Sequence, residues 1–144
     1  EFQTYIKNVL ANAKMLAETL KNNGFKIYSG GTDTHLMLVD LRPFNVKGNL
    51  ASESLSRANI TCNKNGIPFD TEKPMITSGI RLGSQAATTR GFGLKEFEKV
   101  GELITKVIKG LSENPEDNSK VEEEVRNEVV SLCSNFPIYK NLNK

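Results

Sequence analysis

Three long stretches of the chain carry apolar residues at helical spacing, and this spacing constrains the fold more than any other feature. The first stretch runs from Phe2 to Leu20 and the others cover 94–111 and 121–136. Apolar residues three or four positions apart fall on one side of an α-helix. Each stretch therefore predicts an amphipathic helix that must bury one side, and we expect Gly110 to end the second helix.

Shorter segments between these helices alternate apolar and polar residues, which is typical of strands. Strands are predicted at 25–29, 36–41 and 76–83, and a short helix at 49–58 with Leu50 and Leu55 facing inward. The order helix, strand, strand, helix, strand, helix, helix predicts one domain over residues 1–144. Its class is α/β, arranged as an α+β two-layer sandwich with helices on one face of a small sheet of about three strands. The other face would remain available to another domain or subunit.

Composition narrows the class of protein. Of 144 residues, 38% are hydrophobic and 25% charged, which indicates a globular chain. A net charge of +2 does not favour a nucleic-acid partner, and the longest apolar run, 36–39, is too short to cross a membrane. The chain begins at Glu1 with neither an initiator methionine nor a signal-peptide pattern, so we expect a piece of a longer cytoplasmic polypeptide.

The segment 77–83 is the most informative for chemistry. Alternation along a strand places Ile80 and Leu82 toward the helices, and Arg81 on the opposite face between Gly79 and Gly83. An uncrowded guanidinium can hold a carboxylate or phosphate through two parallel hydrogen bonds. The alternative is an ordinary arginine that forms a surface salt bridge, and the spacing leaves both open.

Other polar positions are less specific. His35, the only histidine, lies in the turn 29–35 and could act as an acid, a base or a purely structural residue. One histidine and two distant cysteines cannot form a zinc site, so no metal is expected. The acidic run 122–124 is interpreted as a solvated helix face, and 61–75 as a long functional loop.

Several blocks together resemble the serine hydroxymethyltransferase family. They are Ser29-Gly30-Gly31-Thr32-Asp33-Thr34-His35-Leu36, Arg57-Ala58-Asn59-Ile60-Thr61, Asn63-Lys64-Asn65, Thr77-Ser78-Gly79-Ile80-Arg81-Leu82-Gly83 and Thr89-Arg90-Gly91-Phe92. The blocks occur in the family's order and spacing, and the likeness covers nearly the whole chain.

The resemblance implies the C-terminal small domain of a fold-type I enzyme that uses pyridoxal 5′-phosphate (PLP). Such enzymes interconvert serine and glycine and pass a one-carbon unit to tetrahydrofolate. By resemblance Arg81 would bind the substrate carboxylate, and Asn65 and Lys73-Pro74-Met75 would contact folate. A common bacterial pattern has serine, proline and phenylalanine at these last three positions. Arg90 would lie near the active site, and His35 would support its turn.

The family's PLP-binding lysine lies in the large domain, within a threonine-rich stretch ending in His-Lys, and no such stretch occurs in this sequence. We therefore expect this chain to be inactive alone and to function within a full-length cytoplasmic homodimer. Two alternatives remain open. One is a non-catalytic binding or interaction module that reuses the fold, and the other is a different fold-type I PLP enzyme.

Overall fold

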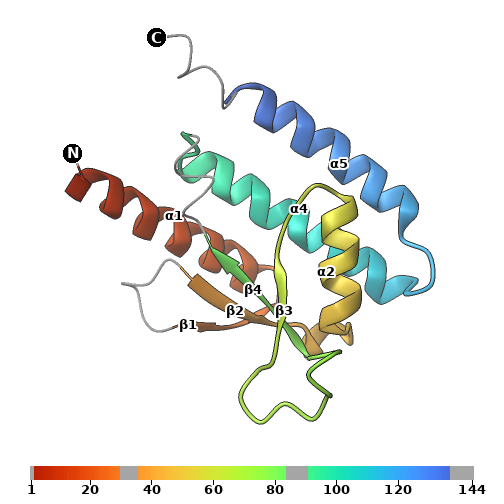
Figure 1. The fold of residues 1–144 in the computed structure, drawn as a ribbon. Coiled ribbons are helices and arrows are strands. Elements are labelled where there is room, and N and C mark those ends of the chain that lie inside the picture. The colour runs from red at the N-terminus through yellow and green to blue at the C-terminus, as the bar shows by residue number, and fades with distance from the viewer. Residues whose placement is uncertain (1, 30–35, 84–90, 137–144) are drawn as a thin grey trace.

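The structure is a computed structural model that describes residues 2–29, 36–83 and 91–136. In chain order its elements are α1 (Phe2–Asn22), β1 (Lys26–Ser29), β2 (Leu36–Asp40), the short 3-10 helix η1 (Arg42–Phe44), α2 (Gly48–Arg57), β3 (Asn63–Asn65), β4 (Gly79–Gly83), α4 (Leu94–Glu113) and α5 (Ser119–Ser134). Figure 1 shows the sheet on one side of the molecule and the helices on the other. This arrangement confirms the predicted two-layer α+β architecture.

The sheet is antiparallel throughout, with the strand order β1-β2-β4-β3. It has one strand more than the sequence predicted, because β3 forms a short edge strand along β4. The three residues of β3 are all polar and none is buried, so no apolar alternation marks the strand. Pairing with β4, rather than burial, defines it.

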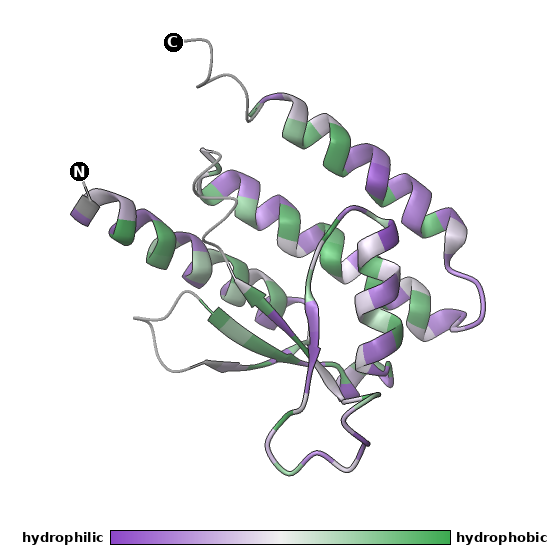
Figure 2. Cartoon of the chain, viewed as in Figure 1, coloured by the Kyte–Doolittle hydropathy of each residue, from purple (hydrophilic) through white to green (hydrophobic). Residues whose placement is uncertain are grey.

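The core lies between the sheet and the helices. Met37 and Val39 of β2 and Ile80 and Leu82 of β4 are buried on the helical side of the sheet. They join a cluster of buried helical residues that includes Leu16, Leu20, Leu55, Ile104, Val107 and Ile108. Figure 2 shows hydrophobic residues along β2 and β4 and along α1 and α4, whereas β3 is hydrophilic. Burial of these faces provides the main stabilisation of the fold.

Two predicted boundaries were wrong. The third strand begins at Gly79 and not at residue 76, because Thr77 adopts a left-handed backbone with φ 61° that cannot continue a strand. The helix α4 continues past Gly110 to Glu113. A Cβ at Gly110 would lie 2.2 Å from Asn118 Oδ1, so this glycine allows the Asn118 side chain to approach α4 closely and does not end the helix.

Two predicted orientations were also wrong. Leu50 lies at the surface, with 36% of its area exposed, whereas Leu55 is buried as predicted. The run 122–124 is not uniformly solvated, because Glu122 is only 4% exposed. A pattern of three acids cannot reveal partners on another helix, and Glu122 has two of them on α2, the buried Ser54 and the half-exposed Arg57.

Glu122 joins α5 to α2 through charge-assisted hydrogen bonds. Arg57 donates to Glu122 from Nε and Nη2 at 2.8 and 2.9 Å, and Ser54 Oγ donates to Glu122 Oε2. Asn118 Nδ2 donates to Ser54 Oγ and to the Val107 carbonyl, each at 3.0 Å. The bonds from Arg57 hold the pKa of Glu122 below its ordinary value, although burial opposes them. The network fixes α5 against both α2 and α4.

We expect Glu122→Gln to lower the free energy of unfolding by about 1–2 kcal/mol at pH 7, because the charge-assisted bonds from Arg57 are lost. The loss is no larger because Arg57 is half-exposed and its guanidinium can bind water instead. A carboxylate with a lowered folded-state pKa stabilises the fold above its unfolded pKa, about 4.3, and loses that effect as the pH falls through the folded pKa. The difference in free energy of unfolding between the unsubstituted protein and Glu122→Gln, measured by urea denaturation, should therefore shrink as the pH falls below the unfolded pKa. Exposed Glu123→Gln is the matched control. Equal stability of all three proteins at pH 7 would contradict the expectation.

Candidate functional site

The face of the sheet away from the helical core carries Arg81. In the register, Arg81 lies directly opposite Leu38 of β2 and Asn63 of β3. Because directly opposed residues point to the same face of a sheet, these three side chains share a surface. Gly79 and Gly83 occupy the same-face positions before and after Arg81 in β4. The predicted exposure of Arg81 between two glycines is thus what the structure shows.

Arg81 is exposed, and its guanidinium has no hydrogen-bond or ion-pair partner among the described residues. Arg42 provides a contrast, since it donates to both carboxylate oxygens of Asp40, with Nη2 to Oδ2 at 2.7 Å. Asp40 is only 1% exposed, and burial raises its pKa, but the hydrogen bonds from Arg42 outweigh burial and leave the pKa below its ordinary value. Arg42 is thus neutralised within the fold, whereas Arg81 can accept an external anion.

The segment 66–78 joins β3, an edge strand of the sheet, to its neighbour β4. Asn65, at the end of β3, lies opposite Gly79 and therefore on the same face as Arg81. Lys73, Pro74 and Met75 are exposed within the loop, and Met75 has 78% of its area accessible. In Figure 1 this loop projects below the sheet. The fold therefore places Arg81 and the predicted folate residues on adjoining elements.

Asp70, which the sequence analysis did not identify, organises this loop. Its carboxylate accepts hydrogen bonds from the backbone N–H groups of Ile67 at 3.2 Å and Glu72 at 2.9 Å, and from both N–H and Oγ of Ser78 at 2.8 Å. Burial raises the pKa of Asp70, but these hydrogen bonds outweigh it and lower the pKa to about 2. The local signal was an aspartate inside a Pro- and Gly-containing loop, a residue type that often binds nearby backbone groups.

The other residues with chemically reactive side chains add little to the description of the site. His35 and Arg90 lie outside the described residues. Cys62 does not qualify as a nucleophile, because burial raises the pKa of its thiol to about 11. Within the described ranges no cluster of histidine, cysteine, aspartate or glutamate could hold a metal ion, and none of the helices there has the length and apolar character to cross a bilayer.

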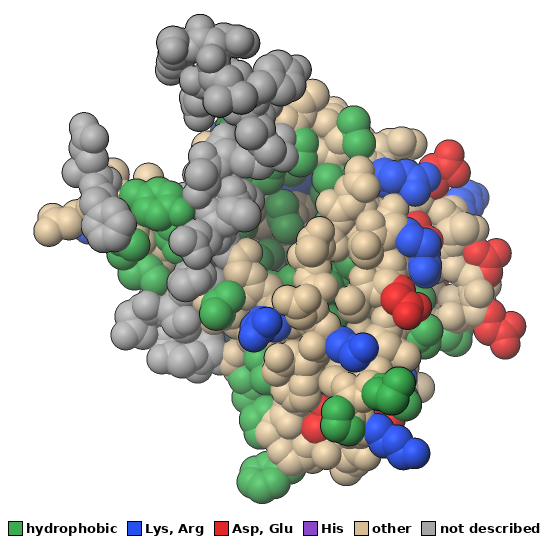
Figure 3. All heavy atoms as spheres, in the orientation of Figure 1, with side chains coloured by type: hydrophobic (Ala, Val, Ile, Leu, Met, Phe, Trp, Pro, Cys, Tyr) green, Lys and Arg blue, Asp and Glu red, His purple; other side chains and the backbone are tan. Residues whose placement is uncertain are grey.

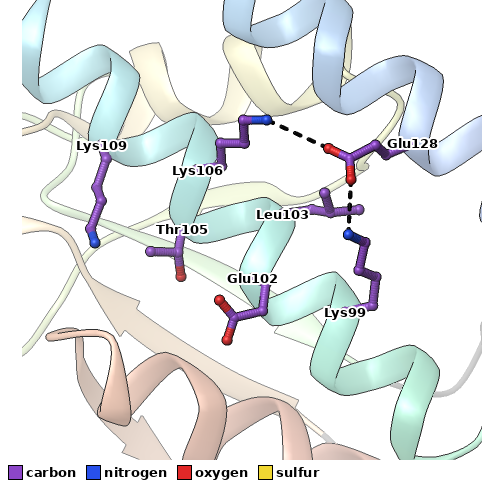
Figure 4. Close-up of a pocket in the computed structure, with 7 residues that line it drawn as sticks. All are labelled: Lys99, Glu102, Leu103, Thr105, Lys106, Lys109 and Glu128. Atoms are coloured by element: carbon purple, nitrogen blue, oxygen red, sulfur yellow. Dashed lines mark hydrogen bonds and ion pairs between the residues drawn. The ribbon is translucent and has the colours of Figure 1, made fainter.

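A hollow of about 360 Å³ beside α4 and α5 is not a convincing ligand site. Its lysines Lys99 and Lys106 are bound to Glu128 of α5, at 2.8 and 3.6 Å (Figure 4). Acidic and basic side chains are interspersed over the α5 side of the molecule in Figure 3. The hollow is therefore part of an ion-paired helix contact.

The described residues do not make a PLP site by themselves. PLP enzymes hold the cofactor through a lysine and an acid at the pyridine nitrogen. Lys26 shares the face of Arg81 but belongs to the far edge strand, and its Nζ lies 5.1 Å from the centre of the Tyr28 ring. The acid on this face, Asp40, is already bound to Arg42.

A two-layer α+β domain with an exposed arginine beside an anchored loop has the chemistry to hold a small carboxylate or phosphate. Comparison with known proteins makes this specific. Residues 1–104 match the family model described as serine hydroxymethyltransferase, and this chain belongs to that family.

Curated relatives agree along almost the whole chain. A serine hydroxymethyltransferase from Pelagibacter ubique is 88% identical over 99% of this chain, and those from Marinomonas sp. and Paramagnetospirillum magneticum are 64% and 62% identical over 97%. In each case the match covers 33% of the relative. The chain therefore spans about a third of the length of the curated relatives it matches.

Proposed function

We propose that this chain is the C-terminal small domain of an enzyme that interconverts serine and glycine and transfers the one-carbon unit to tetrahydrofolate. The observation that carries the proposal is Arg81, an exposed arginine without a described partner between two glycines. Its planar guanidinium can form paired, charge-assisted hydrogen bonds to an amino acid's α-carboxylate. Family membership supports the amino acid as the anion.

The loop 66–78 and Asn65 form the proposed folate-binding part. The Asn65 side chain donates to the Gly66 carbonyl at 2.9 Å and keeps its amide oxygen for a ligand donor. Met75 is exposed, and its thioether can contact an aromatic ring of folate in place of the phenylalanine of the common bacterial pattern. Lys73 and Pro74 would contribute the neighbouring surface.

PLP would supply the electron-withdrawing chemistry, and residues outside this chain would hold it. The domain's own part is to bind and orient the amino acid and to shape the folate surface. We further propose that the full-length protein is a cytoplasmic homodimer, in keeping with its family. His35 and Arg90 are proposed to support the site.

The test uses the full-length protein that contains this chain, purified with PLP. Serine and tetrahydrofolate should give glycine, and omission of tetrahydrofolate should largely abolish glycine formation. A protein that binds neither serine nor tetrahydrofolate would contradict the proposal. It would then favour the non-catalytic binding module, for which the lack of a PLP site among the described residues is the supporting observation.

A further inference from the structure

The loop 66–78 is long for a connection between two paired strands, and its own backbone does little to order it. Its ends lie at the register pair Asn65–Gly79. The backbone hydrogen bonds inside it are those from Asp70 to Ile67 and from Ile76 and Thr77 to Lys73. Loops of this length are normally either mobile or held by side chains. A side-chain anchor is therefore needed to fix it.

Asp70 is that anchor. Its two carboxylate oxygens accept from both limbs of the loop, with Ile67 and Glu72 on one side and Ser78 on the other. Bonds to an ionised carboxylate are stronger than neutral ones. Ser78 directly precedes β4, the strand that carries Arg81. Asp70 thus joins the loop to the start of the strand that presents the arginine.

A second anchor holds the same end of the loop to α2. The N–H groups of Gly48 and Asn49 donate to the carbonyls of Thr77 and Ile76 at 3.0 and 2.9 Å. These donors belong to the first turn of α2 and would otherwise lack intrahelical partners. Thr77 is held in its left-handed conformation, with Oγ1 donating to the Gly79 carbonyl at 3.0 Å. The end of the loop next to β4 is therefore fixed, and Asp70 transmits this position to the exposed limb.

We infer that Asp70 is a positioning residue that holds the loop 66–78 in register with Arg81, so that the folate surface and the carboxylate site keep one geometry. This inference rests on the proposed function. It assigns to Asp70 no contact with either substrate. Its loss should therefore affect the loop, and folate recognition, more than binding of the amino acid.

The experiment compares the full-length PLP-loaded protein with its Asp70→Asn variant. We expect the KM for tetrahydrofolate to rise about tenfold, because charge-assisted bonds are lost, while the affinity for glycine changes less than threefold. Hydrogen exchange should accelerate in peptides covering 66–78 and remain unchanged in α4. Asp117→Asn is the matched control, since Asp117 also accepts from the N–H and Oγ of a serine, Ser119, but in the α4–α5 connection.

An unchanged folate KM, or unchanged exchange in 66–78, would overturn the inference. If Asp70→Asn fails to fold, Ser78→Ala replaces it, because this variant removes one hydroxyl bond and keeps the backbone bond. It should raise the folate KM two- to threefold, with faster exchange confined to the loop, and no change would again overturn the inference. Failure of the proposed function is distinguishable, because the unsubstituted protein would then bind neither serine nor folate.

Discussion

Replacement of Arg81 by alanine in the full-length protein is expected to weaken the binding of serine and glycine about a hundredfold. The change removes two charge-assisted hydrogen bonds to the α-carboxylate. Arg81→Lys should recover only part of the loss, because an ammonium keeps the charge but cannot bind both oxygens as a planar fork. The quantity to measure is the dissociation constant of glycine, by calorimetry.

Arg126→Lys provides the matched control for this experiment. Arg126 lies exposed on α5 and donates to the backbone carbonyl of Arg57 at 3.1 Å, away from the sheet. It should leave glycine affinity unchanged. Stability of the Arg81 variants should also remain unchanged, since no described residue depends on that guanidinium. Glycine affinity unaltered in Arg81→Ala would remove the arginine from the substrate site.

Gly48→Ala is expected to destabilise the domain by about 3 kcal/mol, the upper range for an added methyl group in a filled space. A Cβ at Gly48 would lie 2.1 Å from Thr77 Oγ1 and 2.5 Å from the Gly79 carbonyl oxygen. Thr77 is held at the end of the loop by the bonds from α2, and Gly79 is the first residue of the paired strand β4, so the Gly79 carbonyl cannot withdraw without disturbing the strand. The free energy of unfolding, measured by urea denaturation, tests the expectation.

Gly66→Ala is the control for the glycine change. A Cβ at Gly66 would meet only Asp70 Oδ2, at an ordinary contact distance of 3.8 Å. This variant should be neutral or slightly stabilising, by less than about 1 kcal/mol, since alanine restricts the unfolded chain. Equal effects of the two substitutions would mean that the α2–loop contact is not close-packed.

The sequence carried enough information for the architecture because helical spacing and strand alternation are local signals. The faces of α1 and α4 and the inward direction of Ile80 and Leu82 followed from periodicity alone. The exposure of Arg81 followed from the same alternation. Its role in carboxylate binding depends on the family resemblance, and it stays a prediction.

The features that escaped prediction depend on contacts between distant segments. Glu122 is buried because Arg57 and Ser54, far away in the sequence, surround it. Thr77 and Phe69 adopt left-handed backbone conformations that residues other than glycine and asparagine rarely adopt. The anchoring of Asp70 likewise requires Ser78 to be near in space. None of these pairings produces a periodic pattern that one sequence could reveal.

The helix α2 is bound at both ends, to the loop at Gly48 and Asn49 and to α5 through Ser54 and Arg57. This double attachment links the residues that α5 can accept to those of α2 and of the loop 66–78. Across related enzymes, a neutral residue in place of Glu122 should be accompanied by loss of the arginine at position 57. An alignment of many homologues should therefore show covariation between positions 57 and 122, because the side chains at these positions bind each other across α2 and α5.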